Sequence, residues 1–226
     1  MGHFLSFTSC LLNVVAFVLL LLVSLSGLVI KSIYILILPY VHEFGHDLRI
    51  GVLGFCQTDY ELSTTTTCYG PQRGYTIPFD LVRADGLASS VAGMLDSPTT
   101  SILILHPIAA GFALLSAIFS LLNGRPLMGT ALSFTLWNAV FATVAFAFDI
   151  VVVETAKSRV DSGVFQVYWG SAPWMTLVAA IFIWISVLLS AIKLWTNRRS
   201  RKSMEVEGLL ALVVHCNPAL TRALTK

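Results

Sequence analysis

Residues 101–122 read SILILHPIAAGFALLSAIFSLL and contain no Asp, Glu, Lys or Arg. The hydrocarbon core of a bilayer is about 30 Å thick, and about 20 apolar residues of helix are needed to cross it. This stretch therefore predicts a membrane-spanning helix. Three further runs meet the same criterion, at residues 7–30, 127–153 and 174–195. The sequence predicts an all-α transmembrane protein built as a four-helix membrane bundle.

The composition of the whole chain fits this class. Of 226 residues, 56% are hydrophobic and 12% are charged, whereas a soluble domain has about 25% charged residues. The net charge is only +2, which gives no reason to expect a nucleic-acid partner. Residues 7–30 could instead be a cleaved signal peptide. However, no Lys or Arg precedes the run, and the run exceeds the 7–15 residues that are roughly typical of a signal core.

Basic residues predict the orientation of the chain, because cytoplasmic segments carry an excess of Lys and Arg. The segment from residue 193 onward has seven basic and two acidic residues, a net charge of +5. The loop at 31–100 has four basic and seven acidic residues, a net charge of −3. We therefore expect both termini in the cytoplasm, the loop outside, a membrane domain at 1–195 and a basic tail at 196–226.

The start of that tail concentrates its positive charge next to the membrane. Arg198, Arg199, Arg201 and Lys202 follow the last apolar run within a few residues. A basic cluster in this position attracts anionic lipids, although it is also an ordinary stop-transfer signal. The tail is predicted to contact anionic lipids.

The loop at 31–100 predicts a small β-sheet. Residues 51–57 are typical of a strand, residues 64–67 are β-branched, and 81–95 suits an amphipathic helix. Cys56 and Cys68 lie in this loop, and an oxidising compartment would allow them to form a disulfide. Such a bridge would stabilise the fold by about 3 kcal/mol in the chain-entropy model. Two free thiols remain the alternative.

The string His42-Glu43-Phe44-Gly45-His46 has the H-E-x-x-H pattern. On a helix, histidines at i and i+4 can bind zinc beside a glutamate general base. A third ligand would have to come from Asp59 or Glu61. Three interpretations stay open: a zinc-dependent membrane protease, non-catalytic metal or proton binding, and an ordinary polar linker, which the pattern's low specificity favours.

Two ionisable residues lie inside the predicted spans. His106 could sense protons, because histidine titrates near pH 6.5, or it could simply bond to a neighbouring helix. Asp149 is predicted to pair with Lys157 or Arg159 or to reach the headgroups. Pro107 predicts a kink in the second span. Recurrent small residues predict close helix packing: Ala109, Ala110, Gly111, Ala113, Gly129, Ala131, Ala179 and Ala180.

Several short motifs together resemble the fungal PalI and eisosomal four-span families, and more distantly the claudins. The first group is GVLGFC at 51–56, Cys68 and GY at 74–75; the second is LHPIAAG at 105–111, FDIV at 148–151, YWG at 168–170 and WMTL at 174–177. Claudins have Trp in the loop signature, where this chain has Leu53 and Gly54 beside Gly51. The H-E-x-x-H string is not a feature of these families.

The resemblance implies a plasma-membrane protein without catalysis or cofactors. PalI-like members assist the seven-span sensor of ambient-pH signalling, and eisosomal relatives organise membrane microdomains. We therefore expect a claudin-like bundle that acts as an accessory or scaffold protein. Its expected partners are membrane proteins, including such a sensor, anionic lipids and further copies of itself.

Overall fold

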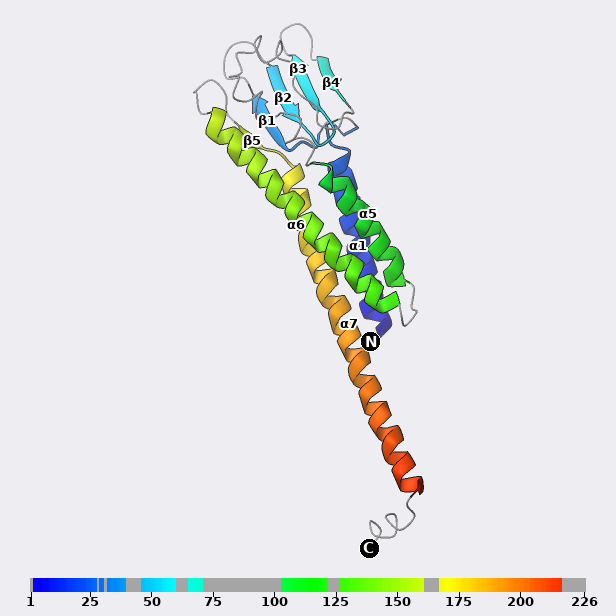
Figure 1. Cartoon of the computed structure of the whole chain (residues 1–226). Helices are drawn as coiled ribbons and strands as arrows, with labels where there is room; N and C mark the ends of the chain where they lie inside the picture. Colours follow the sequence, from blue (N-terminus) through cyan, green and yellow to red (C-terminus); the bar gives the residue numbers. More distant parts are fainter. Residues whose placement is uncertain are drawn as a thin grey trace.

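The computed structural model describes residues 2–27, 29–30, 32–39, 46–59, 65–70, 103–121, 127–160 and 167–216. This part of the chain contains a helical bundle with a β-sheet at one end (Figure 1). The helices are α1 (Gly2–Ser24), α5 (Leu105–Leu121), α6 (Leu127–Val160) and α7 (Ala172–Cys216). We call the end of the bundle beneath the sheet the sheet end, and the end near Gly2 the tail end.

The four helices form a ring. Helix α1 packs against α5 and α7, and α6 packs against the same two helices. The interior of the ring is lined largely by alanine, including Ala109, Ala139 and Ala179, none of which is exposed. Small side chains let the helix backbones approach closely. The predicted packing role is confirmed for six of the eight small residues. Gly111 and Gly129 instead face outward, and a Cβ built on either would meet nothing within 4 Å.

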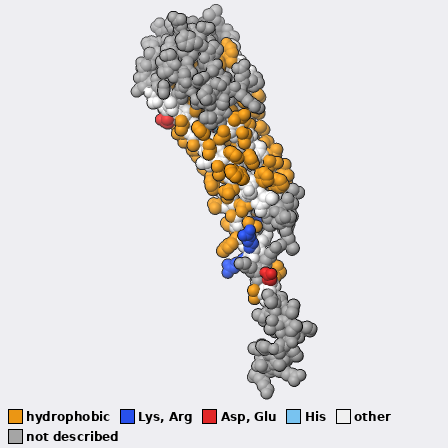
Figure 2. All heavy atoms as spheres, viewed as in Figure 1, with side chains coloured by type: hydrophobic (Ala, Val, Ile, Leu, Met, Phe, Trp, Pro, Cys, Tyr) orange, Lys and Arg blue, Asp and Glu red, His pale blue; other side chains and the backbone are white. Residues whose placement is uncertain are grey.

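The outside of the bundle is apolar. Phe7, Leu114, Trp137, Ile181 and Leu188 are all exposed, and hydrophobic side chains cover the helices from the sheet to the tail end (Figure 2). Such a surface requires lipid as solvent. This arrangement, with the small disulfide-linked sheet described below, confirms the predicted membrane bundle.

Three helices within the described residues are long and apolar enough to cross a membrane: Phe4–Ser24, Gly129–Ser158 and Ala172–Glu207. The apolar helix α5 has 17 residues, at the lower limit for a span, which is roughly 17 residues. The predicted span boundaries differ from the helix boundaries. Helix α6 continues to Val160 and α7 to Cys216, because the polar residues beyond each apolar run are good helix formers.

Helix α1 ends at Ser24 rather than near residue 30. Gly27 has a φ of 85°, a left-handed conformation that glycine adopts readily at helix ends. The apolar residues that follow do not continue the helix. They form strand β1 (Leu36–Pro39).

The sheet is antiparallel, with the strand order β4-β3-β2-β1-β5. The other strands are β2 (His46–Ile50), β3 (Phe55–Asp59), β4 (Thr65–Tyr69) and β5 (Tyr168–Trp169). The predicted strand at 51–57 is wrong in its first half, because 51–54 form the turn between β2 and β3. The expected amphipathic helix at 81–95 lies outside the described residues.

A second apolar core joins the sheet to the bundle. Leu36, Ile50 and Phe55 from the sheet are buried with Val23 of α1 and Val153 of α6. Alternate residues of a strand point to one face, so β1 buries Leu36 and Leu38 together. The sheet is therefore packed onto the helices, and the groups beneath it are shielded.

Candidate functional site

Cys56 and Cys68 form a disulfide, as predicted. They occupy directly opposite positions of β3 and β4. Neighbouring antiparallel strands bring opposed Cβ atoms within about 4.5–5.5 Å, close to the separation that a bridge needs. The bridge therefore links the edge strand β4 covalently to its neighbour β3.

We expect this bridge to protect both thiols in intact cells. A membrane-impermeant maleimide should label neither Cys56 nor Cys68 until a reductant is added, and both afterwards. Mass spectrometry of the labelled peptides measures this. Cys10, which is buried in α1, serves as the control and should stay unlabelled in both conditions. Labelling of the loop cysteines without reductant would contradict the disulfide.

The loop signature Gly51, Leu53 and Gly54 forms the turn of the β2–β3 hairpin. The Gly51 N–H donates to the Gly54 carbonyl at 2.9 Å, and the Val52 N–H donates to Ser26 Oγ at 3.1 Å. A Cβ on Gly51 would lie 2.6 Å from the Gly27 Cα. The absence of a side chain thus lets the hairpin turn rest directly on the end of α1.

His106 and Asp149 meet beneath this sheet. His106 Nε2 lies 3.2 Å from Asp149 Oδ2, and the two side chains are 1% and 0% exposed. His106 Nδ1 lies 3.1 Å from the Leu103 carbonyl oxygen. Thr176 Oγ1 lies 3.4 Å from Nε2. This polar cluster joins α5, α6 and α7 at the sheet end.

The hydrogen bonds constrain where the protons of this cluster lie. A carbonyl oxygen can only accept, so His106 Nδ1 carries a hydrogen and donates to Leu103. One further proton then lies between His106 Nε2 and Asp149 Oδ2. Whichever atom holds it, the pair is neutral overall, which suits a site without solvent contact. The shared hydrogen bond thus joins α5 to α6 without placing a net charge in the buried site.

The sequence did not predict this pairing. The expected partner Lys157 instead bonds to Glu154, at 3.2 Å, and the side chain of Arg159 lies outside the described residues. Asp149 cannot reach headgroups because it is fully buried. The sequence did contain a hint of the pairing. His106 and Asp149 each lie about one turn inside the predicted outer end of their span, so they are expected at a similar depth in the membrane. Thr176 gave no such signal.

Pro107 does not kink α5. The helix begins at Leu105, so the proline lies in the first turn, where a missing N–H breaks no intrahelical bond.

The metal motif is only partly described. His46 is the first residue of strand β2 and pairs with Asp59 of β3, so it does not lie on a helix as the zinc-binding geometry requires. His42, Glu43 and Glu61 lie outside the described residues.

A second polar group lies nearer the tail end. Asn13 Nδ2 donates to Ser186 Oγ at 2.7 Å, and Ser9 Oγ lies 2.7 Å from the same oxygen. These bonds join α1 to α7. Across the ring, Asn138 of α6 is fully buried, and neither of its side-chain polar atoms has a partner in the described part of the chain.

We expect Asn138→Leu to raise the stability of the bundle. Each buried polar group without a partner costs about 1–3 kcal/mol, and leucine removes both polar atoms while keeping the branched shape of the side chain. The melting temperature in detergent at a fixed scan rate measures the effect. Thr135→Val is the matched control, because the Thr135 hydroxyl already donates to the Ala131 carbonyl at 2.8 Å; it should give no gain. A lower melting temperature for Asn138→Leu would show that the amide has a partner.

The basic cluster continues helix α7 beyond the bundle (Figure 1). Arg198 and Arg199 are exposed, and the Arg199 guanidinium carbon lies 6.0 Å from the centre of the Trp195 ring. The side chains of Arg201 and Lys202 lie outside the described residues. Arg198 and Arg199 are thus placed on a helix where lipid headgroups could reach them, and lipid binding stays a prediction.

A four-helix membrane bundle with a small disulfide-linked antiparallel sheet at one end defines a claudin-like membrane protein. The family model described as the SUR7/PalI family matches residues 5–186, from the start of α1 into α7. The chain belongs to the SUR7/PalI family. A search of curated proteins finds no match. The family is a non-enzymatic membrane family, which makes this chain a membrane accessory protein in the broad sense.

Proposed function

We propose that this protein is a non-enzymatic accessory protein of the plasma membrane that assists an ambient-pH signalling receptor. The observation that carries the proposal is the family match over residues 5–186, which includes the sheet, the disulfide and the polar cluster. PalI-like proteins, which the motifs resemble, assist a seven-span pH sensor. Both termini are cytoplasmic in this proposal, and the sheet is outside.

Two features of the structure support a binding role. The hairpin turn, the disulfide and the apolar junction hold the sheet rigidly on the helices, so it can present a fixed surface to a partner outside the membrane. The exposed faces of the helices are apolar, so they can pack against the spans of another membrane protein. A scaffold needs such surfaces and no reacting groups.

Deletion of the gene tests the proposal. We expect poor growth at alkaline pH and loss of the receptor from the plasma membrane, both restored by the wild-type gene. Crosslinking and pull-down from native membranes should recover the receptor. Normal alkaline growth with an unchanged receptor location would refute the role. Such a result together with punctate cortical localisation of this protein would favour a microdomain organiser instead.

A further inference from the structure

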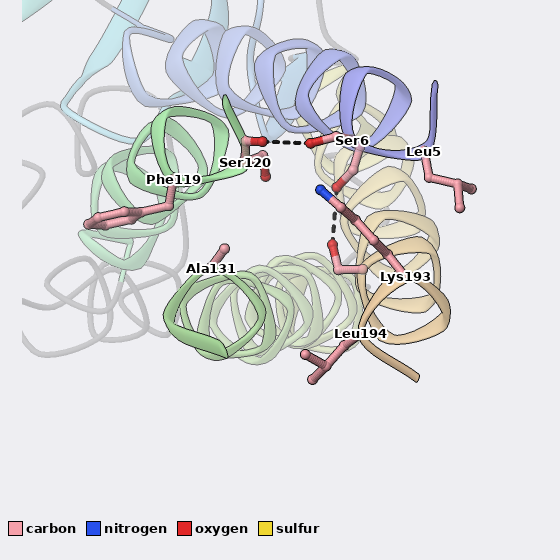
Figure 3. Close-up of a pocket in the computed structure, with 9 residues that line it drawn as sticks. Leu5, Ser6, Phe119, Ser120, Ala131, Lys193 and Leu194 are labelled. Atoms are coloured by element: carbon pink, nitrogen blue, oxygen red, sulfur yellow. Dashed lines mark hydrogen bonds between the residues drawn. The ribbon is translucent and has the colours of Figure 1, made fainter. Parts of the chain in front are cut away.

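The tail end of the bundle contains a polar pocket between the helices (Figure 3). The pocket is partly open, and the volume available in it to water-sized groups is about 30 Å³. All four helices contribute to its lining: Ser6 from α1, Ser120 from α5, Ala131 from α6, and Ser190 and Lys193 from α7. Among the residues that the structure describes, the lining contains no Asp or Glu.

Lys193 is the charged residue of this lining. Its side chain is half-buried and points from α7 toward α1 and the space between the helices (Figure 3). A lysine at the end of a span ordinarily extends along the helix toward the headgroups. None of the ion pairs found among the described residues involves Lys193. Partial burial of an ammonium group between helices costs free energy of desolvation unless an anion pairs with the group.

The serines of the pocket differ in what they can offer a ligand. The Ser6 hydroxyl donates to the Ser120 carbonyl at 2.7 Å, and the Ser120 hydroxyl donates to the Ser116 carbonyl at 2.8 Å. Ser190 Oγ instead lies 3.2 Å from Ser9 Oγ, and either oxygen could be the donor. Ser9 Oγ also lies 2.7 Å from Ser186 Oγ. When Ser186 donates to Ser9 and Ser9 donates to Ser190, the Ser190 hydrogen is free for a ligand. The pocket therefore presents donors and one positive charge, which suit a group with several acceptor oxygens.

We propose that this pocket binds the phosphate of an anionic phospholipid headgroup, with Lys193 as the charged partner and Ser190 as a hydroxyl donor. The apolar outer surface of the neighbouring helices would take the acyl chains. Basic pockets between membrane helices bind anionic headgroups in this way. The site differs from the exposed Arg198 and Arg199, whose attraction for lipid is diffuse, because it holds one lipid per chain. The proposal does not depend on the role in pH signalling.

Titration of the purified full-length protein tests the site. Short-chain phosphatidic acid is added to protein in phosphatidylcholine nanodiscs, and native mass spectrometry counts the bound lipids. We expect one saturable phosphatidic acid per chain. Lys193→Gln should weaken binding about tenfold, as loss of a charge-assisted contact does. Lys193→Arg, which keeps the charge, should bind within about threefold of the wild type. A separate titration with inorganic phosphate distinguishes a lipid from a free anion.

Arg199→Gln is the matched control, since it removes one positive charge outside the pocket. This substitution should weaken lipid binding by less than about fivefold, which is the effect of removing roughly one surface charge. Competition by millimolar inorganic phosphate would support a phosphate site but identify the free anion as its ligand. Equal losses in Lys193→Gln and Arg199→Gln, or lipid binding without saturation, would overturn the proposal. If Lys193→Gln fails to fold, Ser190→Ala replaces it and should weaken binding about threefold or more; unchanged binding in Ser190→Ala would then overturn the proposal.

Discussion

Gly170→Ala should prevent normal folding of this protein. Gly170 is buried between β5 and the start of α7, and its N–H donates to the Ile35 carbonyl at 2.8 Å. A Cβ at this position would collide with the carbonyl oxygen of Tyr34. Because the obstacle is backbone, no side chain can move aside, and the strand pair β1–β5 must separate. The Ala172 N–H, which donates to the same Tyr34 oxygen at 3.1 Å, would lose its partner too.

We expect the substitution to cost about 3 kcal/mol or more, from overpacking together with two lost hydrogen bonds. Monodisperse yield on size exclusion and the melting temperature at a fixed scan rate measure the loss. Gly111→Ala is the control, because a Cβ there meets nothing within 4 Å. It should not destabilise the protein and should stabilise α5 by about 0.5–1 kcal/mol, since alanine is the better helix former. Equal behaviour of the two variants would contradict the close approach at Gly170.

Asp149→Leu should destabilise the bundle by about 3 kcal/mol. Leucine keeps the branched shape of the side chain but leaves His106 Nε2 buried, with Thr176 at 3.4 Å as its one remaining polar neighbour among the described residues. Breaking a buried pair by removing one partner costs about 3–5 kcal/mol, whereas membrane hydrogen bonds contribute less on average. Asp149→Asn keeps a hydrogen-bonding group of the same shape and should cost only about 1 kcal/mol.

A double-mutant cycle isolates the pair. Because His106→Leu removes the stranded imidazole, His106→Leu combined with Asp149→Leu should be more stable than Asp149→Leu alone. We expect a coupling free energy of at least about 1 kcal/mol, a value typical of residues in one network. Melting temperatures of the three variants and the wild type, in the same detergent, provide the cycle. Additive effects would mean that the two side chains do not interact.

The sequence predicted those parts of the fold that depend on one segment at a time. The helix at residues 105–121 lies entirely within the predicted run at 101–122. Cys56 and Cys68, which are 12 residues apart in sequence, are bonded as expected. Strands β1, β2 and β5 were missed. For β1 the reason is that an apolar run such as 35–38 is too short to distinguish a strand from the end of a helix. Residues 36–39 form a strand because they pair with two neighbouring strands: Leu36 of β1 lies opposite Ile50 of β2 and Trp169 of β5.

The candidate site shows the same division. His106 and Asp149 were recognisable as unusual residues of membrane spans, but their partners were not. The two lie 43 residues apart in sequence, and Ser9 and Ser186 lie 177 apart. Local charge patterns could only suggest neighbours such as Lys157. The actual contacts form because antiparallel helices place residues that are distant in sequence at the same depth in the bundle.

The sequence alone thus determined that residues 101–122 and three similar runs would form helices with lipid-facing surfaces. Transfer of a helix into lipid depends on the composition of that helix, because its backbone bonds are satisfied internally. Only the tertiary structure decided that His106 bonds to Asp149, that the hairpin turn at Gly51 rests on α1, and that Lys193 faces a pocket. Each of these depends on a contact between distant segments, which no single stretch of sequence contains.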